Sequence, residues 1–305
     1  MRILVVGAGA TGGYFGGRLA QAGRDVTFLV RPARAEQLRA QGLQIVSPRG
    51  DVTLTPQTVT TGSSLPTFDV VVLAVKAFGL ASAIEDFGGA VGPETMIVPL
   101  LNGMRHIDLL IERFGERPVL GGLCFIATTL DGDGRIIHLA RLHDLTYGER
   151  SGETSQRVRA LDAVMQDAGF DAHLSTRVLP EMWEKWITLA SLGGITCLMR
   201  GTIGDVAAAP NGVEFASALV DECVATATAA GFAQDPDFVA RTRAGMTRAG
   251  STVTSSMYRD LQRGNDVEAD QILGDLIARA WSFGIATPLL GAAYANLKVY
   301  QAARR

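Results

Sequence analysis

The stretch RILVVGAGATGGYFGGRLAQAGRDVTFLVR, residues 2–31, decides the fold of this chain. An apolar run from Ile3 to Val6 leads into three spaced glycines, a helical stretch continues to Gln21, and a second apolar run begins at Val26. The β-branched and aromatic residues of the two runs are typical of strands. This order predicts a strand, a glycine-rich turn, a helix and a second strand.

The spacing of Gly7, Gly9 and Gly12 has a physical reason. Backbone amides at a helix N-terminus can hold a pyrophosphate only where no side chain keeps it away. In this motif the first glycine permits the tight turn, the second lets the pyrophosphate approach, and the third lets the helix lie close to the strand. Because the motif follows a strand and opens a helix, it predicts dinucleotide binding by Gly7, Gly9, Ala10, Thr11 and Gly12. The alternative is a glycine turn without a ligand.

The composition limits the class of protein. The chain has 305 residues, of which 47% are hydrophobic and 19% charged, and this suits two globular domains. A net charge of −3 without a Lys/Arg block argues against nucleic-acid binding. The longest apolar stretch after the first strand, residues 187–199, contains two glycines and is too short to cross a membrane. We therefore expect a soluble protein with neither nucleic acid nor membrane as a partner.

The cysteines and histidines form no pattern that indicates a disulfide framework or a metal site. Cys124, Cys197 and Cys223 are widely spaced, which fits buried thiols in a reducing cytoplasm. The four histidines are scattered, and none pairs with a cysteine or a carboxylate at zinc-ligand spacing. The nucleophile motif GxSxG is absent, which argues against a hydrolase. The sequence thus predicts a cytoplasmic protein without a metal cofactor.

Arg31 follows the second strand, at the place where NAD-binding proteins usually have an acid that binds the ribose 2′-hydroxyl. A guanidinium suits the 2′-phosphate of NADP, which a carboxylate would repel. Arg34 is a candidate for a second contact. Asp25 lies at the start of that strand, away from the carboxyl ends where ligands bind, so it is not a candidate for binding the ribose. The pattern favours NADP as the cofactor, the alternative being a solvated arginine at the start of the next helix.

Two later strands are predicted to end in polar side chains. The apolar run that starts at Phe68 ends in Lys76, and the run that starts at Thr95 is followed by Asn102. Parallel strands present their carboxyl ends at one edge of a sheet, so we expect Lys76 and Asn102 to face the cofactor and the substrate. The alternatives are a lysine that leaves the sheet and an asparagine turn.

The β pattern ends near residue 177. Before that point, residues 32–41 predict a helix and residues 43–60 a β-hairpin inserted into the sheet. We expect an α/β Rossmann domain at residues 1–177, which binds NADP, and an all-α domain at residues 178–305. The helices of the second domain are expected at residues 179–200, 212–230, 235–247, 253–263, 266–283 and 288–303.

Three features stand out in the helical part. Lys185 is flanked by two tryptophans, Ser255-Ser-Met257 opens a predicted helix, and Glu268 lies in the next one. Taken singly, each has an ordinary structural interpretation: a surface lysine with a buried stem, a helix cap and a solvated glutamate. Their order along the chain carries more information than any one of them.

Together these motifs resemble a known family. The glycine motif, the strand ending in Lys76, Asn102-Gly-Met104, the tryptophan-flanked Lys185, Ser255-Ser-Met257 and Glu268 are similar to those of 2-dehydropantoate 2-reductase, also called ketopantoate reductase, across nearly the whole chain. The resemblance implies a Rossmann domain, a helical domain and a substrate cleft between them. It also implies NADPH-dependent reduction of ketopantoate to pantoate, within pantothenate biosynthesis.

The resemblance also implies roles for single residues. Lys185 matches the catalytic lysine and Glu268 the active-site glutamate. Ser256 matches a serine that binds substrate, while Lys76 and Asn102 match residues that line the cofactor and substrate cleft. Hydride transfer to a ketone leaves charge on its oxygen, which a protonated lysine can stabilise before it donates the proton. In this scheme Glu268 orients Lys185 or a substrate hydroxyl, and Ser256 binds the substrate's carboxylate.

One departure from the family concerns the substrate. The family commonly has asparagines four and eight residues after the lysine, where this chain has Leu189 and Gly193. We expect these two residues on the substrate side, where missing polar groups weaken discrimination for substrate hydroxyls. One alternative is therefore a reductase of a different, more apolar 2-oxo acid or ketone. An alternative of another class is a non-catalytic NADP(H)-binding sensor. A homodimer is compatible with the helical domain, although the sequence indicates no interface.

Overall fold

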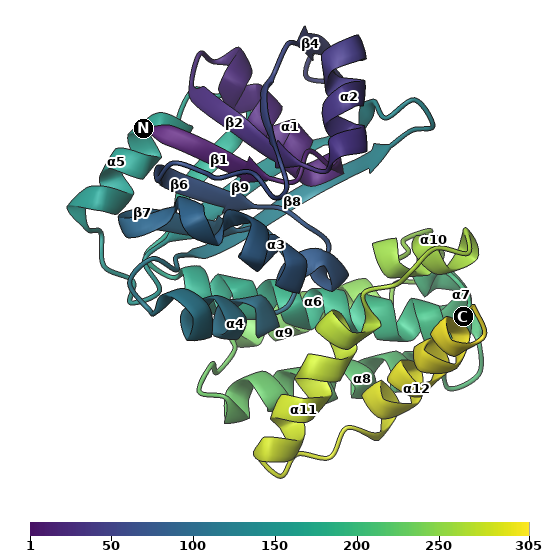
Figure 1. Cartoon of the computed structure of the whole chain (residues 1–305). Coiled ribbons are helices and arrows are strands. Elements are labelled where there is room, and N and C mark those ends of the chain that lie inside the picture. The colour runs from purple at the N-terminus through teal and green to yellow at the C-terminus, as the bar shows by residue number, and fades with distance from the viewer. Residues whose placement is uncertain (305) are drawn as a thin grey trace. The chain divides into compact units, whose positions relative to one another are not determined.

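The computed structural model describes residues 1–304, which form two compact units (Figure 1). Unit 1 comprises residues 1–101 and 106–179, and unit 2 comprises residues 102–105 and the chain from residue 180 onward. Unit 1 is an α/β structure and unit 2 is helical, which confirms the predicted fold class.

A parallel sheet forms the centre of unit 1. Its strands follow the order β5-β2-β1-β6-β7, with parallel pairing throughout. The order reverses on the two sides of β1, and in sheets of this kind ligands bind at the carboxyl ends of the strands next to such a reversal. The strands are β1 (Arg2–Val6), β2 (Asp25–Val30), β5 (Gln57–Thr60), β6 (Phe68–Leu73) and β7 (Val91–Pro99).

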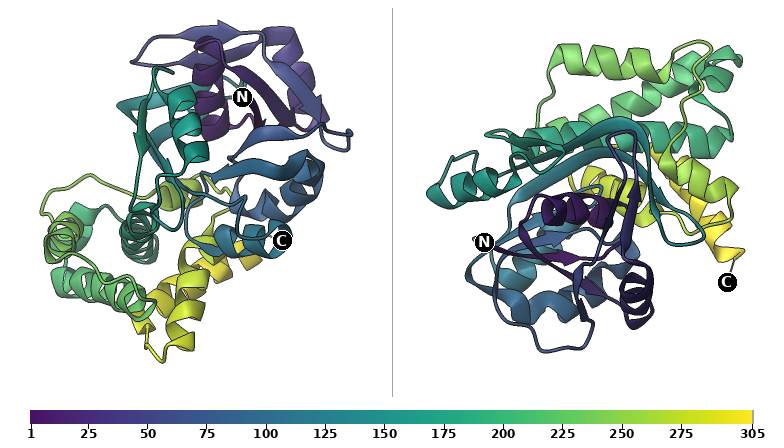
Figure 2. Two further views of the ribbon diagram at one scale, coloured as in Figure 1. Left: turned by 90° about the vertical axis from the view of Figure 1, so that its left-hand side faces the viewer. Right: turned by 90° about the horizontal axis from the view of Figure 1, so that it is seen from above.

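A second sheet of unit 1 is built on two long antiparallel strands, β8 (Gly121–Leu130) and β9 (Ile136–Gly148) (Figure 2). Strands β3 (Leu43–Val46) and β10 (Asp171–Leu174) run parallel to β9, and β4 (Val52–Leu54) is antiparallel to β3. Of the hairpin predicted at residues 43–60, β3 and β4 form an antiparallel pair in this second sheet, whereas residues 57–60 form β5 of the first sheet. The prediction missed this because the ladder partner of β3 lies far away in the sequence.

Helix α1 (Ala10–Gln21) contacts strands of both sheets. A Cβ atom on Gly16 would lie 2.7 Å from the ring of Phe28 in β2, and a Cβ atom on Gly13 would lie 2.5 Å from Cδ1 of Ile136 in β9. Both distances are shorter than van der Waals contact, so a larger residue at either position would force the helix away from a sheet. Tyr14, between these glycines, is fully buried.

The remaining helices of the N-terminal half are short. They are α2 (Pro32–Gln41), η1 (Ala77–Gly79), α3 (Leu80–Phe87), η2 (Gly88–Ala90), α4 (Arg105–Phe114) and α5 (Gln156–Met165). The predicted helix at residues 32–41 is confirmed by α2.

All regular secondary structure of unit 2 within the described residues is helical. The predicted helices are present, although those predicted from residues 253 and 266 begin three residues later, and the six-residue α7 was missed. No helix within residues 1–304 is long and apolar enough to cross a membrane. The elements are α6 (Val178–Met199), α7 (Ile203–Ala208), α8 (Gly212–Ala229), α9 (Pro236–Met246), α10 (Ser256–Gln262), the π-helical turn η3 (Asp270–Gly274), α11 (Asp275–Ser282) and α12 (Pro288–Ala302).

Two buried histidines lie beside α1 in unit 1. The hydroxyl of Tyr14 lies 2.7 Å from Nδ1 of His143, and the hydroxyl of Ser47 lies 2.8 Å from Nδ1 of His138. The Nε2 atom of His138 lies 3.0 Å from the carbonyl oxygen of Leu142, so it carries a proton and leaves Nδ1 to accept from Ser47. Each histidine is only 4% exposed, and this arrangement suits the neutral form.

We expect the free energy of unfolding to fall as the pH decreases below the ordinary histidine pKa of 6.5. Burial is the largest cause that lowers the pKa of both His138 and His143 in the folded chain, and the charges of Arg18 and Arg49 add to it; the hydrogen bond to the Leu142 carbonyl and the carboxylate of Asp171 oppose it without reversing it. Between 6.5 and these lower values the unfolded chain binds more protons than the folded one, so acid favours unfolding in that window. Denaturant titrations over this pH range measure the slope. It should become shallower in His143→Gln and stay unchanged in a control variant of the exposed His173, whereas equal slopes in all three proteins would contradict the prediction.

Candidate functional site

The glycine motif joins β1 to α1. Gly7 has a φ of +97°, a conformation that favours glycine, and its amide donates a hydrogen bond of 3.0 Å to the carbonyl of Leu29 in β2. Helix α1 begins directly after its N-cap residue, Gly9. Within the described residues, this helix end has no side-chain cap hydrogen bond. The first turn, from Ala10 to Gly12, contains no acidic residue. This helix end can therefore offer backbone amides and a favourable dipole to an anion.

Gly9 and Gly12 have different surroundings. A Cβ atom on Gly9 would have no described atom within 4 Å, so that side of the motif is open. A Cβ atom on Gly12 would lie 2.2 Å from the carbonyl oxygen of Gly7 and 2.8 Å from Cβ of Ala74. Gly12 thus allows close packing of the helix on the sheet, while Gly9 keeps the approach to the first turn clear. Both features fit the pyrophosphate of a dinucleotide.

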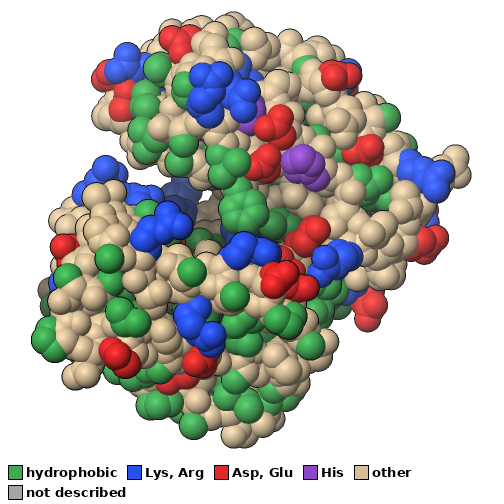
Figure 3. Space-filling view, turned by 180° about the vertical axis from the view of Figure 1, so that it is seen from behind, with side chains coloured by type: hydrophobic (Ala, Val, Ile, Leu, Met, Phe, Trp, Pro, Cys, Tyr) green, Lys and Arg blue, Asp and Glu red, His purple; other side chains and the backbone are tan. Residues whose placement is uncertain are grey.

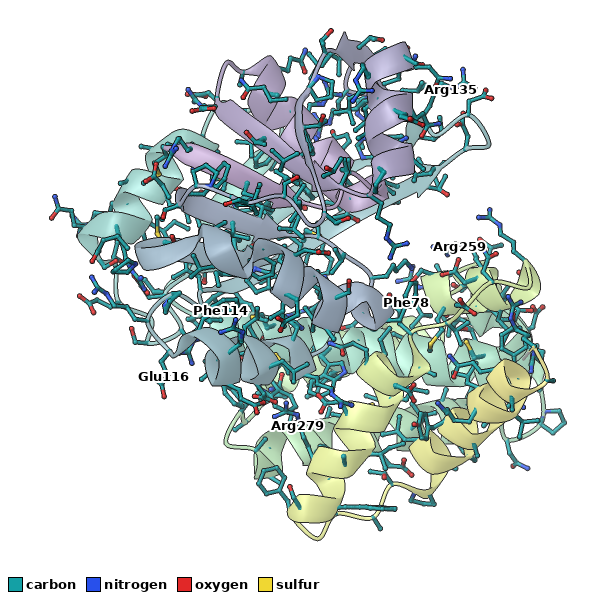
Figure 4. The ribbon with its side chains drawn as sticks, in the orientation of Figure 1. Phe78, Phe114, Glu116, Arg135, Arg259 and Arg279 are labelled. Carbon is teal, nitrogen blue, oxygen red and sulfur yellow. The ribbon has the colours of Figure 1, made fainter. Side chains whose placement is uncertain are left out.

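Arg34 of α2 is fixed beside the glycine motif. Its Nε atom donates to the carbonyl of Ala8 at 3.1 Å, and its Nη1 atom donates to the carbonyl of Gly134 at 2.9 Å. Figure 4 shows Arg135 in this same connection between β8 and β9, next to α2. Burial lowers the pKa of Arg34, and its Nη2 atom is a buried donor without a hydrogen-bond partner among the described residues. Arg31, at the start of α2, is exposed.

The strands that precede Lys76 and Asn102 end earlier than predicted. Strand β1 ends at Val6, and the ladders pair Val6 with Leu73 and Leu73 with Pro99. Strand β6 therefore stops where the glycine turn removes its neighbour β1, and β7 stops together with β6. Lys76 is exposed and lies at the start of η1, and Asn102 is half-buried. The prediction that Lys76 ends its strand is wrong, although both residues follow the carboxyl ends of their strands.

Lys185 lies on α6 in unit 2 and is only 8% exposed. The rings of its neighbours Trp183 and Trp186 are buried, with centroids 4.9 Å apart. Trp183 also stacks on Phe232, and Nε1 of Trp186 donates a hydrogen bond of 2.8 Å to the carbonyl of Ile272. A solvated surface lysine does not fit this burial, so the first of the ordinary interpretations is wrong for Lys185.

The serine pair at the start of α10 divides into a cap and an exposed residue. The hydroxyl of Ser255 is buried, accepts from the amide of Tyr258 at 2.9 Å, and lies 2.9 Å from the hydroxyl of Thr196 on α6. Ser256 is the first residue of α10 and is exposed. The helix cap is therefore Ser255, which leaves the hydroxyl of Ser256 on the surface of unit 2.

Glu268 lies just before a helix rather than inside one. The helical backbone resumes at Ala269, and the carbonyl of Glu268 accepts from the amide of Ile272 at 3.0 Å. The prediction of a helix from residue 266 is wrong at this end. The half-buried Glu268 thus stands at the entry to the π-helical turn η3.

Gly193 faces a methionine that the sequence did not single out as its partner. Lys185, Leu189 and Gly193 are spaced by four residues and share one face of α6. A Cβ atom on Gly193 would lie 2.7 Å from Cε of Met257, which is 3% exposed in α10. The thioether of Met257 therefore fills the space that a side chain at residue 193 would need.

The structure divides the predicted site residues between the two units. The residues expected to bind the dinucleotide lie mainly in unit 1, and those expected to act on the substrate lie mainly in unit 2. Unit 1 contains Gly7, Gly9, Ala10, Thr11, Gly12, Arg31 and Lys76, and unit 2 contains Asn102, Lys185, Leu189, Gly193, Ser256 and Glu268.

Comparison with known proteins identifies the family. The model described as ketopantoate reductase PanE/ApbA matches residues 3–152, and the model of the ketopantoate reductase PanE/ApbA C terminal matches residues 177–301. The chain belongs to the ketopantoate reductase family. It is therefore an oxidoreductase, and its family depends on NADH or NADPH.

Individual relatives extend over nearly the whole chain. The uncharacterized oxidoreductase YkpB of Bacillus subtilis is 39% identical over 302 residues, which cover 99% of each chain. The 2-dehydropantoate 2-reductase of Mesorhizobium japonicum is 30% identical over 90% of this chain and 89% of its own. The crystal structure of 2-dehydropantoate 2-reductase from Methylococcus capsulatus is 28% identical with a TM-score of 0.87, and it covers 100% of this chain and 98% of its own.

Two glycine variants separate binding from folding in the glycine motif. Gly9 has an extended backbone conformation that alanine adopts, and its missing side chain faces open space, so Gly9→Ala should change stability by less than about 1 kcal/mol. The added methyl group should raise the Kd for NADPH at least about tenfold. Gly12→Ala should instead destabilise the fold by about 1–3 kcal/mol, because its Cβ meets a carbonyl oxygen. Unchanged NADPH affinity in a folded Gly9→Ala protein, measured by calorimetry, would refute the role of Gly9.

Proposed function

We propose that this protein catalyses the NADPH-dependent reduction of 2-dehydropantoate (ketopantoate) to pantoate. The observation that carries the proposal is the burial of Lys185 on α6, in a member of the ketopantoate reductase family. Lysine is rarely buried unless its amine is paired, and a buried amine in a reductase of this family is a candidate proton donor. The 2-dehydropantoate 2-reductase of Mesorhizobium japonicum supports the choice of substrate by its similarity.

The proposed mechanism assigns a role to each group of this chain. NADPH, when bound, supplies the hydride. As the hydride reaches the 2-oxo carbon, the ammonium group of Lys185 stabilises the charge on the substrate oxygen and then donates a proton to it. Glu268 orients Lys185 or a substrate hydroxyl, and the exposed hydroxyl of Ser256 binds the carboxylate of the substrate. Lys76 and Asn102 contribute to the binding of cofactor and substrate.

The domains, the partners and the location follow from this function as further proposals. Residues 1–177 bind the cofactor, and residues 178–305 bind the substrate and provide the surface of a homodimer. The partner is a small 2-oxo acid rather than a nucleic acid or a membrane, which suits a cytoplasmic enzyme of pantothenate biosynthesis. The interspersed acidic and basic side chains on the face shown in Figure 3 agree with a small-molecule partner.

Two arginines support NADP rather than NAD as the cofactor. Arg31 is exposed directly after β2, where a carboxylate would favour NAD. Arg34 holds a positive charge beside the glycine motif and keeps its Nη2 donor unsatisfied. Buried donors without a partner are uncommon, and each requires an explanation, such as a bound anion. We propose that both arginines interact with the 2′-phosphate of NADP.

Replacement of Arg31 tests the choice of cofactor. Arg31→Asp should lower the preference for NADPH over NADH at least about tenfold, because it puts a repelling charge in place of a phosphate partner. Arg39→Asp makes the same change at an exposed position of the same helix and should keep the wild-type preference. Calorimetry with both cofactors measures the ratio of Kd values. Equal losses for NADPH and NADH in Arg31→Asp would contradict the proposal.

The contact between Gly193 and Met257 favours a second candidate function. Family members commonly place an asparagine where this chain has Gly193, and here the methyl group of Met257 lies at that place. Leu189 replaces the other asparagine on the same face of α6. A site that gains apolar atoms and loses amides discriminates less strongly for a substrate hydroxyl. The second candidate is thus the reduction of a more apolar 2-oxo acid by the same chemistry.

Two substrates that differ by one hydroxyl group separate these candidates. Ketopantoate and 3,3-dimethyl-2-oxobutanoate share a carbon skeleton, except that the latter has a methyl group in place of the hydroxymethyl group. A kcat/KM ratio of about 10⁴ in favour of ketopantoate indicates a site that binds the hydroxyl, and we expect this result for the first candidate. A ratio near or below one establishes the second.

A variant of the lysine controls for the chemistry in this assay. Lys185→Met should lower kcat at least about 100-fold with either substrate, since it removes the proton donor. Its Kd for NADPH should stay close to that of the wild type, because the glycine motif and both arginines are intact. Full activity of Lys185→Met would contradict both candidate functions. NADPH binding by the wild type without turnover of any 2-oxo acid would instead establish the non-catalytic sensor.

A further inference from the structure

A single π-helical turn, η3, lies two residues after Glu268 in unit 2. Turns of this kind are rare, because their wider hydrogen-bond pattern is less favourable than that of an α-helix, and they occur frequently at functional sites. The turn continues directly into α11, so it is an insertion at the start of a longer helix. Its three leading residues, Asp270, Gln271 and Ile272, each make a contact with a different segment of unit 2.

These contacts hold the turn from three directions. The carboxylate of Asp270 accepts from the hydroxyl of Tyr294 at 2.5 Å and from Nζ of Lys298 at 2.9 Å, both on α12. The carbonyl of Ile272 accepts the indole N–H of Trp186, which directly follows Lys185 on α6. Figure 4 labels Arg279 of α11, whose guanidinium lies 5.7 Å from the ring centroid of this same tryptophan. The turn is therefore tied to the helix that carries the proposed proton donor.

Gln271 makes the third contact. Its side chain is 5% exposed, and its Nε2 atom donates a hydrogen bond of 2.9 Å to the carbonyl of Asn102. The next residue, Gly103, has a φ of +77°, and a Cβ atom there would lie 2.7 Å from the carbonyl oxygen of Gln271. The peptide between Asn102 and Gly103 thus lies directly on Gln271. A side chain at residue 103 would separate them.

We propose that Gln271 is a positioning residue for the reduction, and that its hydrogen bond to Asn102 fixes this asparagine with respect to Glu268 and Lys185. The inference rests on the proposed function, which gives those three residues their roles. Gln271 lies three residues after Glu268, at the start of the helix that follows this glutamate. It directly precedes Ile272, whose carbonyl accepts the hydrogen bond from Trp186. One rigid turn therefore carries the constraints on all three groups, which is what a site held to a fraction of an ångström requires.

The removal of this hydrogen bond should affect catalysis more than folding. Gln271→Met keeps the length of the side chain but has no donor, and its kcat should fall about 10- to 100-fold through misplacement of the reacting groups. Gln262→Met is the matched control, because Gln262 of α10 donates an amide hydrogen bond of 3.0 Å to the hydroxyl of Tyr258, also in unit 2. Its kcat should equal that of the wild type. Rates are expressed per mole of folded protein, and melting temperatures are recorded for both variants.

A second variant distinguishes a positioning role from a structural one. In Gln271→Glu the ionised carboxylate faces a carbonyl oxygen, but the protonated acid can donate to it. The ratio of its kcat to that of the wild type should therefore rise as the pH falls through the range in which the glutamate protonates, while the ratio for Gln271→Met should stay constant. This dependence on pH is not expected from a residue that only supports the fold.

The outcomes separate this inference from the proposed function. If the wild type reduces no 2-oxo acid with NADPH, the proposed function fails before Gln271 is tested. If the wild type is active, the inference is overturned by a Gln271→Met protein whose kcat per folded molecule equals that of Gln262→Met, or by a flat pH ratio for Gln271→Glu. A loss of kcat without a matching loss of melting temperature, together with acid rescue of Gln271→Glu, supports it.

Discussion

The close approach of α1 to the sheets on either side of it constrains the rest of unit 1. Gly13 and Gly16 have no side chains, so the helix backbone lies against Ile136 on one side and Phe28 on the other. This distance fixes the first turn of α1 against the ends of the strands. Since β1, β6 and β7 end in register at Val6, Leu73 and Pro99, the segments that carry Lys76 and Asn102 both leave the sheet at that level. The packing of α1 therefore determines where, along the direction of the strands, the glycine motif and the segments with Lys76 and Asn102 begin.

Local features of the fold were predictable from the sequence, and features set by distant neighbours were not. The turn after β1 and the helices of unit 2 depend on nearby residues, so glycine spacing and periodicity found them. Ile45 of β3 pairs with Ile136 of β9, which lies much later in the sequence. This is why β3 was assigned to the wrong sheet. The end of β6 at Leu73 has the same kind of cause, because β6 stops where its neighbour β1 stops.

The candidate site shows a similar limit. Family resemblance indicated Lys185, Ser256 and Glu268, and the roles proposed for them depend on their chemistry rather than on long-range packing. The contact of Met257 with Gly193 was hidden, because a glycine in a helix does not reveal what fills the space beside it. The sequence also could not show which of Ser255 and Ser256 caps α10 and which is exposed, since either hydroxyl could cap a helix. These details bear on substrate choice, and only three-dimensional contacts supply them.

The π-helical turn needs support, because it replaces α-helical hydrogen bonds with a less favourable pattern. Much of that support comes from α12, whose first amides, at Leu289 and Leu290, donate to the carboxylate of Glu222 in α8 at 2.9 Å each. This cap also suits the helix dipole, since it places negative charge at a helix N-terminus. The anchored α12 then presents Tyr294 and Lys298 to Asp270, and although burial alone would raise the pKa of this carboxyl group, their hydrogen bonds lower it. Asp270 therefore stays ionised at neutral pH. A series of ionic and hydrogen-bonded contacts thus connects α8 through α12 to the π-helical turn. These contacts offset the less favourable hydrogen-bond pattern of the turn, and the groups that make them are not the ones proposed to react.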